Sequence, residues 1–261
     1  MPYQTLELER RGQTAWIWMN RPDKHNAFDE SLVAELTSAA QDIGQDAGVR
    51  ALVLAGRGKS FSAGADMDWM RRQGAMSLAE NLADARRTAE MFRTLAGLRT
   101  PTIARVHGPA IGGGMGLAAA CDICVASTGA AFATPEVRLG LIPAVISPYV
   151  MRAIGARQCQ RYFLTGERIS AARARELGLV HELAEPEGLD ACVQGLIEAL
   201  AAGSPRAQAS ARDLIGAVTH KPITPDLAEE TAQRIAECRA SADARDGLSA
   251  FLEKRRPPWQ P

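Results

Sequence analysis

The chain has 261 residues, of which 46% are hydrophobic, and its 30 basic and 30 acidic side chains give a formal net charge of zero. That length fits one large domain or a core with an appendage, and the balanced charge provides no long-range field for nucleic acid or an acidic membrane. The first residues show no secretory signal, and no window approaches the ~20 uninterrupted apolar residues that span a bilayer. We expect a cytoplasmic protein without nucleic-acid or membrane partners.

The five cysteines are scattered, and Cys121 and Cys124 form a single C-x-x-C pair. Such a pair is compatible with a redox site or half of a zinc site. The surrounding CDICVAS is apolar and no second pair completes a metal tetrad, which favours two buried thiols in a reduced protein and no metal.

The first part of the chain alternates short strands and helices. Apolar alternation on both sides of Gly12 predicts a hairpin. A helix is predicted from Asp29 to Gly44, where glycine would end it. The apolar run at 51–56 predicts a strand buried on both faces. Ser77 and Glu80 have the spacing of a capping box that opens a helix to about residue 97.

The same alternation continues to about residue 190. A strand is predicted in TIARVHG, a glycine-rich turn and alanine-rich helix in GPAIGGGMGLAAA, and another strand in CDICVAS. This order predicts an α/β core with crossover helices. From about 190 the pattern is helical only, with helices from Ser204-Pro205, over 225–240 and in GLSAFLEKRR. We expect a core at 1–195 and a helical region at 196–261.

Two glycine-rich turns, FSAGADMDW (61–69) and HGPAIGGGMGL (107–117), each follow a strand. Glycine and alanine let a ligand approach the main chain closely. A helix that begins inside GGGMGLAAA has free N–H groups and a partial positive charge at its first turn. Two converging N–H groups would stabilise an oxygen that gains negative charge, as in an enolate, where one donor contributes roughly 3 kcal/mol.

Each turn alone is also compatible with tight helix–strand packing. The second turn is not a phosphate-binding P-loop, because no Gly-Lys-Ser/Thr follows. It does not complete a dinucleotide fingerprint either. Gly112 and Gly114 fill the first two positions, but the third is Leu117, which is too bulky for that packing.

Glu136, in TPEVRLGLIP, is a carboxylate in an otherwise apolar segment. Burying it costs free energy unless it is paired or protonated. One interpretation is a surface glutamate paired with Arg138. The other is a general acid/base whose pKa an apolar pocket raises.

Together with NRPDKHNAF, LTGERISAARARELGLV and FLEKRRP, these segments follow the order and spacing of the crotonase superfamily, the enoyl-CoA hydratases and isomerases. The chain resembles that family over nearly its whole length. The resemblance implies a crotonase-like ββα spiral core, a helical C-terminal trimerisation region, and a homotrimer or dimer of trimers. It implies an acyl-CoA thioester substrate and no cofactor, since coenzyme A is part of the substrate.

The resemblance also assigns residues. The backbone N–H groups of Ala65 and Gly113 become the oxyanion hole, and Glu136 carries proton transfer. Coenzyme A and the acyl chain are expected to lie along Lys24, His25, Ala27, Ala63, Gly64, Asp66 and Met67. Phe251 and Lys254 are expected to contact the nucleotide of a neighbouring subunit's coenzyme A. Lys254 is equally compatible with a solvated helix charge.

The chain departs from the family at two positions. Two-glutamate hydratases carry a first glutamate where this chain has Gly116, which leaves Glu136 alone. A single carboxylate suffices for the proton shuttle of an isomerase, whereas hydration must also activate water. The second departure is LIPAVISPYV in place of a glycine-rich PGxGG stretch.

That second variant looks like bacterial methylglutaconyl-CoA hydratases, so hydration of a branched or dicarboxylic enoyl-CoA is favoured. A distal carboxylate would need a cation, and the nearby candidates also fit the solvent face of a helix: Arg71, Arg72, Arg86 and Arg87.

Three alternatives stay open. The chain could be a single-glutamate Δ3,Δ2-enoyl-CoA isomerase, or a catalytically idle coenzyme A-binding scaffold. Hydrolysis through Ser62 or Ser147 with His107 as base is a third, although neither serine has a G-x-S-x-G context.

Overall fold

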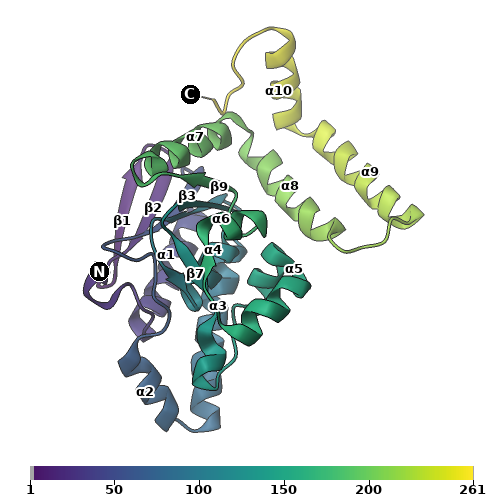
Figure 1. The fold of residues 1–261 in the computed structure, drawn as a ribbon. Helices are drawn as coiled ribbons and strands as arrows, with labels where there is room; N and C mark the ends of the chain where they lie inside the picture. The colour runs from purple at the N-terminus through teal and green to yellow at the C-terminus, as the bar shows by residue number, and fades with distance from the viewer. Residues whose placement is uncertain (1–2, 261) are drawn as a thin grey trace.

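The structure is a computed structural model that describes residues 3–260, and it consists of a mixed α/β core and a helical arm (Figure 1). The strands are β1 (Leu6–Arg11), β2 (Thr14–Met19), β3 (Ala51–Gly56), β4 (Thr102–Val106), β5 (Ala110–Ile111), β6 (Ile123–Ser127), β7 (Ala131–Ala133), β8 (Ile169–Ser170) and β9 (Glu182–Ala184). The α-helices are α1 (Glu30–Gln45), α2 (Met67–Ala75), α3 (Leu78–Ala96), α4 (Gly113–Ala120), α5 (Ser147–Thr165), α6 (Ala171–Glu176), α7 (Leu189–Ala202), α8 (Pro205–Val218), α9 (Pro225–Ala240) and α10 (Ala242–Leu252). The 3-10 helices are η1 (Pro22–Lys24), η2 (Pro135–Leu139) and η3 (Pro186–Gly188).

Six strands form the main sheet in the order β1-β2-β3-β4-β6-β9. The predicted hairpin β1–β2 is antiparallel, and every other neighbouring pair is parallel. β2 and β3 are buried along their whole length, as expected for strands covered on both faces. The α/β core predicted from the sequence is confirmed.

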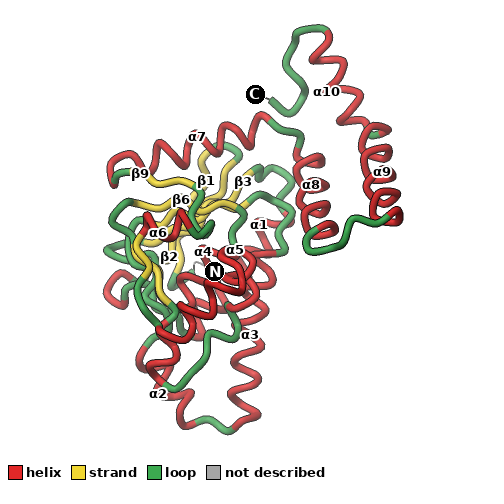
Figure 2. Tube along the Cα trace, turned by 45° about the vertical axis from the view of Figure 1, so that its right-hand side comes forward, coloured by secondary structure: helices red, strands yellow, loops and turns green. Residues whose placement is uncertain are grey.

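Helices cover both faces of this sheet (Figure 2). On one face, α7 buries Leu189 and Val193 against Trp16, Trp18 and neighbouring strand residues. On the other, α1, α3 and α4 pack in the larger core, which also contains the second sheet, β5-β7-β8. Because β5 pairs with β7 in that sheet, the segments that follow these two strands, α4 and η2, are brought together.

Two helix starts follow the predicted capping chemistry. The Asp29 side chain accepts a hydrogen bond from Leu32 N, and Ser77 and Glu80 form a capping box. The predicted end at Gly44 is wrong, because α1 continues to Gln45. A Cβ at Gly44 would lie 2.7 Å from Leu98 Cδ2, so this glycine serves close packing and not helix termination.

Helices α8, α9 and α10 form an arm that extends away from the core in both views (Figures 1 and 2). The tail after α10 returns to the start of the arm, where Trp259 Nε1 donates to Ala202 O. From the core, buried Arg50 donates to Gly203 O at 2.5 Å and to Trp259 O at 3.2 Å. The expected boundary after residue 195 falls inside α7, which packs on the core sheet; a division of the chain into two units stays a prediction.

No helix in residues 3–260 combines the length and the apolar character that crossing a bilayer requires.

Candidate active site

The first glycine-rich turn is held by backbone hydrogen bonds on two sides. Ala63 N donates to His25 O, and Phe28 N donates to Gly64 O. On the other side, Ser62 O accepts from Ile111 N at 2.9 Å, in the strand that leads into the second turn. The two turns predicted to form one site therefore lie side by side.

Ala65 is positioned by a parallel bridge to Phe28. Phe28 N and O bond with Gly64 O and Asp66 N, the two residues that flank Ala65. In a parallel bridge, a residue whose two neighbours both bond to the partner strand directs its own N–H away from that strand. The N–H of Ala65 therefore faces away from Phe28, toward the side on which Ser62 meets the second turn.

Gly113 is the first residue of α4, after Gly112 in a left-handed conformation (φ 52°). The first N–H groups of a helix have no partner within it, and the helix dipole adds a partial positive charge there. Across residues 3–260, the N–H groups of Ala65 and Gly113 donate to no acceptor in the chain. Two free donors on adjacent turns are what an oxyanion hole requires, and their role stays a prediction.

The glycines of these turns are required by close contacts. A Cβ at Gly114 would lie 2.5 Å from Ser62 O, and one at Gly113 would lie 2.8 Å from the Phe28 ring. Gly64 has φ +92°, and its Cβ would lie 3.1 Å from Ile111 O. A side chain at Gly64 or Gly114 would push the two turns apart, and one at Gly113 would push α4 away from the Phe28 ring.

Glu136 reaches the second turn from η2. Gly112 N donates to Ala133 O at 2.8 Å, which fixes the end of β7 against the start of α4. A Cβ built on Gly112 would lie 3.1 Å from Glu136 Oε1, so the carboxyl group lies directly beside the turn. Glycine at 112 leaves this space to the carboxylate.

The environment of Glu136 is that of a proton-transfer group. Its Oε2 is buried without a hydrogen-bond partner in the described residues. Burial raises the pKa of the Glu136 carboxyl above its ordinary value, and a hydrogen bond from its own backbone partly opposes this. The alternative pair with Arg138 is not formed, because Arg138 Nη2 instead donates to Thr165 O at 3.4 Å.

The position of the missing first glutamate is filled by apolar atoms. A Cβ on Gly116 would lie 2.3 Å from Ile146 Cγ2 and 3.1 Å from the Phe92 ring. Ile146 belongs to LIPAVISPYV, the second segment that departs from the family pattern. The two segments that depart from the family pattern are therefore in contact, and the Ile146 side chain occupies the space beside Gly116.

The expected coenzyme A loop lies against the first turn. His25 and Lys24 are exposed, and His25 Nδ1 lies 3.0 Å from Ser60 Oγ. Lys24 Nζ lies 3.6 Å from Asp68, in the first turn of α2. Ala27 is buried, and Met67 is 75% exposed at the start of α2. Their contacts with coenzyme A stay predictions.

Asp66 performs a structural task in addition to the predicted binding role. Its buried carboxylate caps α2 by accepting from Asp68 N, and it pairs with Arg21 at 3.2 Å. Neither α2 nor Arg21 was predicted from the sequence; Arg21 also pairs with Asp29 and donates to Ala27 O. Asp66, immediately before MDWMRRQGA, is the signal in the sequence for this helix start.

Asn26 is a second residue that the sequence analysis missed. It is fully buried, and its amide donates to Arg57 O and Ser60 O, both at 2.8 Å. Its Oδ1 accepts from Arg21 N, and its carbonyl accepts from Ser62 Oγ. Asn26 thus ties the coenzyme A loop to the first turn, a role that its place in NRPDKHNAF indicated only as part of a motif.

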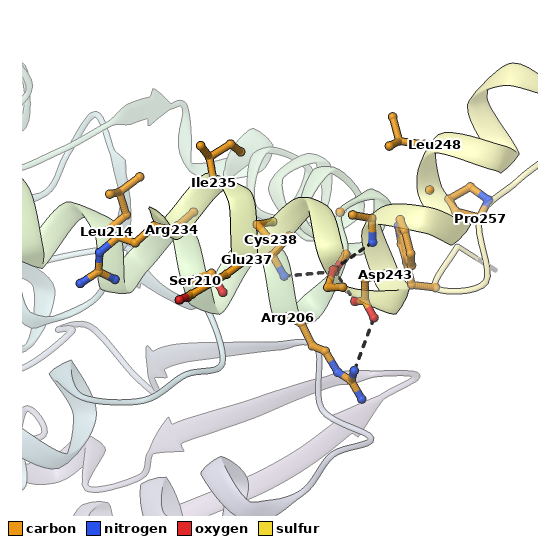
Figure 3. Close-up of a pocket in the computed structure, with 18 of the residues that line it drawn as sticks. Arg206, Ser210, Leu214, Arg234, Ile235, Glu237, Cys238, Asp243, Leu248 and Pro257 are labelled. Carbon is orange, nitrogen blue, oxygen red and sulfur yellow. Dashed lines mark hydrogen bonds and ion pairs between the residues drawn. The ribbon is translucent and has the colours of Figure 1, made fainter. Parts of the chain in front are cut away.

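Phe251 lies in α10 and Lys254 just after it. In both views α10 is in the arm, apart from α4 (Figures 1 and 2). Phe251 is 80% exposed and lines a cleft of 1030 Å³ formed by α8, α9, α10 and the tail (Figure 3). Figure 3 also shows the contact of Arg206 with Asp243, which joins α8 to α10. Neither Glu136 nor either turn lines this cleft, and the expected contact of Phe251 and Lys254 with a neighbouring subunit's coenzyme A stays a prediction.

The four arginines considered for a distal carboxylate differ in their partners. Arg71 pairs with Asp68, Arg72 with Glu30, and Arg87 with buried Asp84. Among the described residues, Arg86 forms no ion pair. Arg86 is therefore the candidate that could bind a distal carboxylate without breaking an existing ion pair.

The alternative chemistries lack the required geometry. Ser62 Oγ is buried and donates to Asn26 O, and Ser147 Oγ donates to Ala144 O. His107 instead lies 3.0 Å from Gly58 O, with a pKa lowered by burial. Cys121 and Cys124 are unpaired and buried, and burial raises the pKa of Cys124 to about 12, which opposes a redox role.

Known proteins resemble the chain over almost its whole length. A sequence model described as enoyl-CoA hydratase/isomerase matches residues 9–261. A short-chain-enoyl-CoA hydratase of Clostridium acetobutylicum is 32% identical over 98% of this chain and 97% of its own. A crotonyl-CoA hydratase of Syntrophomonas wolfei is 31% identical over 98% of both chains.

Solved structures agree with this similarity. The crystal structure of an enoyl-CoA hydratase from Shewanella pealeana has a TM-score of 0.95 and 41% identity, and covers 98% of this chain and 96% of that one. The predicted crotonase-like fold is therefore confirmed.

Proposed function

The chain belongs to the enoyl-CoA hydratase/isomerase family, and on that premise we propose that it is an enoyl-CoA hydratase that adds water to an α,β-unsaturated acyl-CoA. The observation that carries the proposal is the Glu136 carboxyl beside the turn that presents the free N–H of Gly113; its Oε2 is buried and has no hydrogen-bond partner within residues 3–260. A base with a raised pKa and two adjacent oxyanion donors are the groups that the reaction requires.

The reaction follows from these groups. The thioester oxygen accepts hydrogen bonds from the N–H groups of Ala65 and Gly113. Ionised Glu136 takes a proton from a water molecule as the water oxygen bonds to C3, and the double-bond electrons move onto the thioester oxygen as an enolate. Glu136 then gives the proton to C2 as the enolate collapses. The products are the 3-hydroxyacyl-CoA and the regenerated carboxylate.

We propose that coenzyme A enters along Lys24, His25 and Ala27, with no cofactor other than the coenzyme A of the substrate. A branched or methylglutaconyl-type acyl group is the proposed substrate, with Arg86 as the available cation. We propose a cytoplasmic location, because all five cysteines are free thiols, as in a reducing compartment.

We propose a homotrimer or dimer of trimers assembled through the arm. Large apolar side chains are exposed there, among them Ile223 (95%), Phe251 (80%) and Leu252 (78%). Apolar groups left in water in this number favour an interface.

Isomerisation is the second candidate, because the space beside Gly116 holds Ile146 and leaves one carboxylate at the site. One carboxylate can move a proton from C2 to C4 without water. The test is product analysis after incubation with a 2-enoyl-CoA and with a 3-enoyl-CoA. The proposal predicts the 3-hydroxyacyl product from the 2-enoyl-CoA. Double-bond migration alone would replace the hydratase with the isomerase, and an idle scaffold would exchange no C2 proton of an acyl-CoA with D₂O.

A further inference from the structure

Ile146 closes the α4 side of the candidate site. It lies just before α5, its side chain is 4% exposed, and its Cγ2 would be 2.3 Å from a Cβ at Gly116. The Phe92 ring lies against the same position, and it packs against Tyr149 with ring centroids 5.6 Å apart. The wall beside Gly116 is therefore apolar and densely packed.

This wall is next to the Glu136 carboxyl. Gly112 is the N-cap of α4, and Gly116 N donates to its carbonyl oxygen at 3.0 Å, which closes the first turn of the helix. Glu136 Oε1 faces Gly112, and Ile146 faces Gly116. Glu136 and Ile146 therefore flank the two ends of one backbone hydrogen bond at the start of α4.

We propose that Ile146 is a positioning residue for hydration: by filling the space beside Gly116 it excludes water and any second polar group from that side of Glu136, so that Glu136 alone holds the reacting water. The inference rests on the hydratase function proposed above. It explains how one carboxylate serves both proton transfers, because the proton taken from water has no other acceptor on the α4 side.

The electrostatic surroundings agree with this role. Burial is the cause that raises the pKa of Glu136, and no charged side chain is among its causes. On the same 3-10 helix, Arg138 donates to Thr165 O. From α5, Tyr149 packs against the Phe92 ring, and its pKa is raised mainly by burial. Removing apolar volume at 146 would therefore act through water entry near Glu136.

The experiment measures the pH dependence of kcat for hydration in Ile146→Val, Ile146→Ala and the wild-type protein. Ile154→Ala is the matched control, because Ile154 is a similarly buried isoleucine within α5 (5% exposed). Admitted water lowers the pKa of Glu136, so the acid limb should move to lower pH by about half to one unit in Ile146→Ala. Ile146→Val should move it less, and Ile154→Ala should leave it in place. KM should change little in all three.

The outcomes separate the two proposals. Absence of hydration by wild-type protein would refute the proposed function itself. Hydration with an unmoved acid limb in both Ile146 variants, or the same movement in Ile154→Ala, would show that Ile146 is only a packing residue.

A second measurement uses the contact itself. Gly116→Ala should lower kcat at least tenfold, and Ile146→Ala in the same chain should recover most of that loss, because it removes the atoms that the new Cβ meets. Independent, additive effects of the two substitutions would overturn the inferred contact.

Discussion

Gly113→Ala should separate oxyanion geometry from stability. The new Cβ would lie 2.8 Å from the Phe28 ring, whereas carbon atoms in contact are separated by about 3.5–4.0 Å, so roughly 1 Å of displacement is needed. Phe28 is 2% exposed and packs against Phe92, with ring centroids 6.3 Å apart, so its ring has little room to yield. The first turn of α4 must therefore shift and carry the Gly113 N–H with it.

The expected loss is large in rate and moderate in stability. A displacement of about 1 Å at a catalytic group lowers the rate by roughly 10²-fold. Overpacking a core costs about 1–3 kcal/mol of unfolding free energy. Steady-state kinetics with an enoyl-CoA and urea denaturation measure the two quantities.

Gly44→Ala is the matched control, because its Cβ would also meet a buried side chain, that of Leu98, at 2.7 Å, but in α1. It should lose a similar or smaller amount of stability, since alanine is the better helix former, and keep its kcat. A Gly113→Ala protein that turns over at the wild-type rate would refute the oxyanion role of this N–H.

Three further predictions follow from the structure. The rate of hydration should rise with pH through a pKa above the ordinary glutamate value, because Glu136 acts in its ionised form and burial raises its pKa. The same shift means that the folded state binds more protons than the unfolded state, so Glu136 makes the protein less stable as pH rises through that range. A rate profile governed by an ordinary carboxyl pKa would contradict this prediction. Arg50→Met should lower the free energy of unfolding by about 2–4 kcal/mol, because it removes the hydrogen bonds to Gly203 O and Trp259 O. Backbone amides at 202–206 and 257–260 should exchange hydrogen faster, and unchanged exchange there would show that Arg50 does not fix the arm. In the native protein, alkylation followed by mass spectrometry should label Cys192 and Cys238 before Cys124, whose pKa burial raises to about 12, and early labelling of Cys124 would contradict its burial.

Local chemistry made parts of the fold predictable from the sequence. Asp29 and Ser77 cap their helices within three residues, and such short-range signals do not depend on the rest of the chain. The glycine-rich turns were recognisable from their composition, although the contacts that require their glycines join distant parts of the chain. A Cβ at Gly114, Gly113 or Gly64 would lie 2.5, 2.8 or 3.1 Å from its nearest neighbour, which is closer than ordinary van der Waals contact.

Long-range contacts explain what the sequence did not reveal. A glycine at position 44 is typical of a helix end, but here the absence of a side chain leaves room for Leu98, more than fifty residues later in the chain. The start of α2 depends on Asp66, which Arg21 holds from another loop. Ile146 and Gly116 are thirty residues apart, and neither residue alone indicates that they are in contact. Pairings of this kind are set by the packing of the whole core.

Glu136→Gln tests the central claim most directly, because glutamine keeps the shape of the side chain and removes its proton chemistry. The measurement is kcat for hydration of a short-chain enoyl-CoA, with the Kd for the acyl-CoA product determined on the same protein. The account predicts a loss of at least 10³-fold in kcat with Kd within a few-fold of wild type. Turnover near the wild-type rate would contradict the assignment of proton transfer to Glu136.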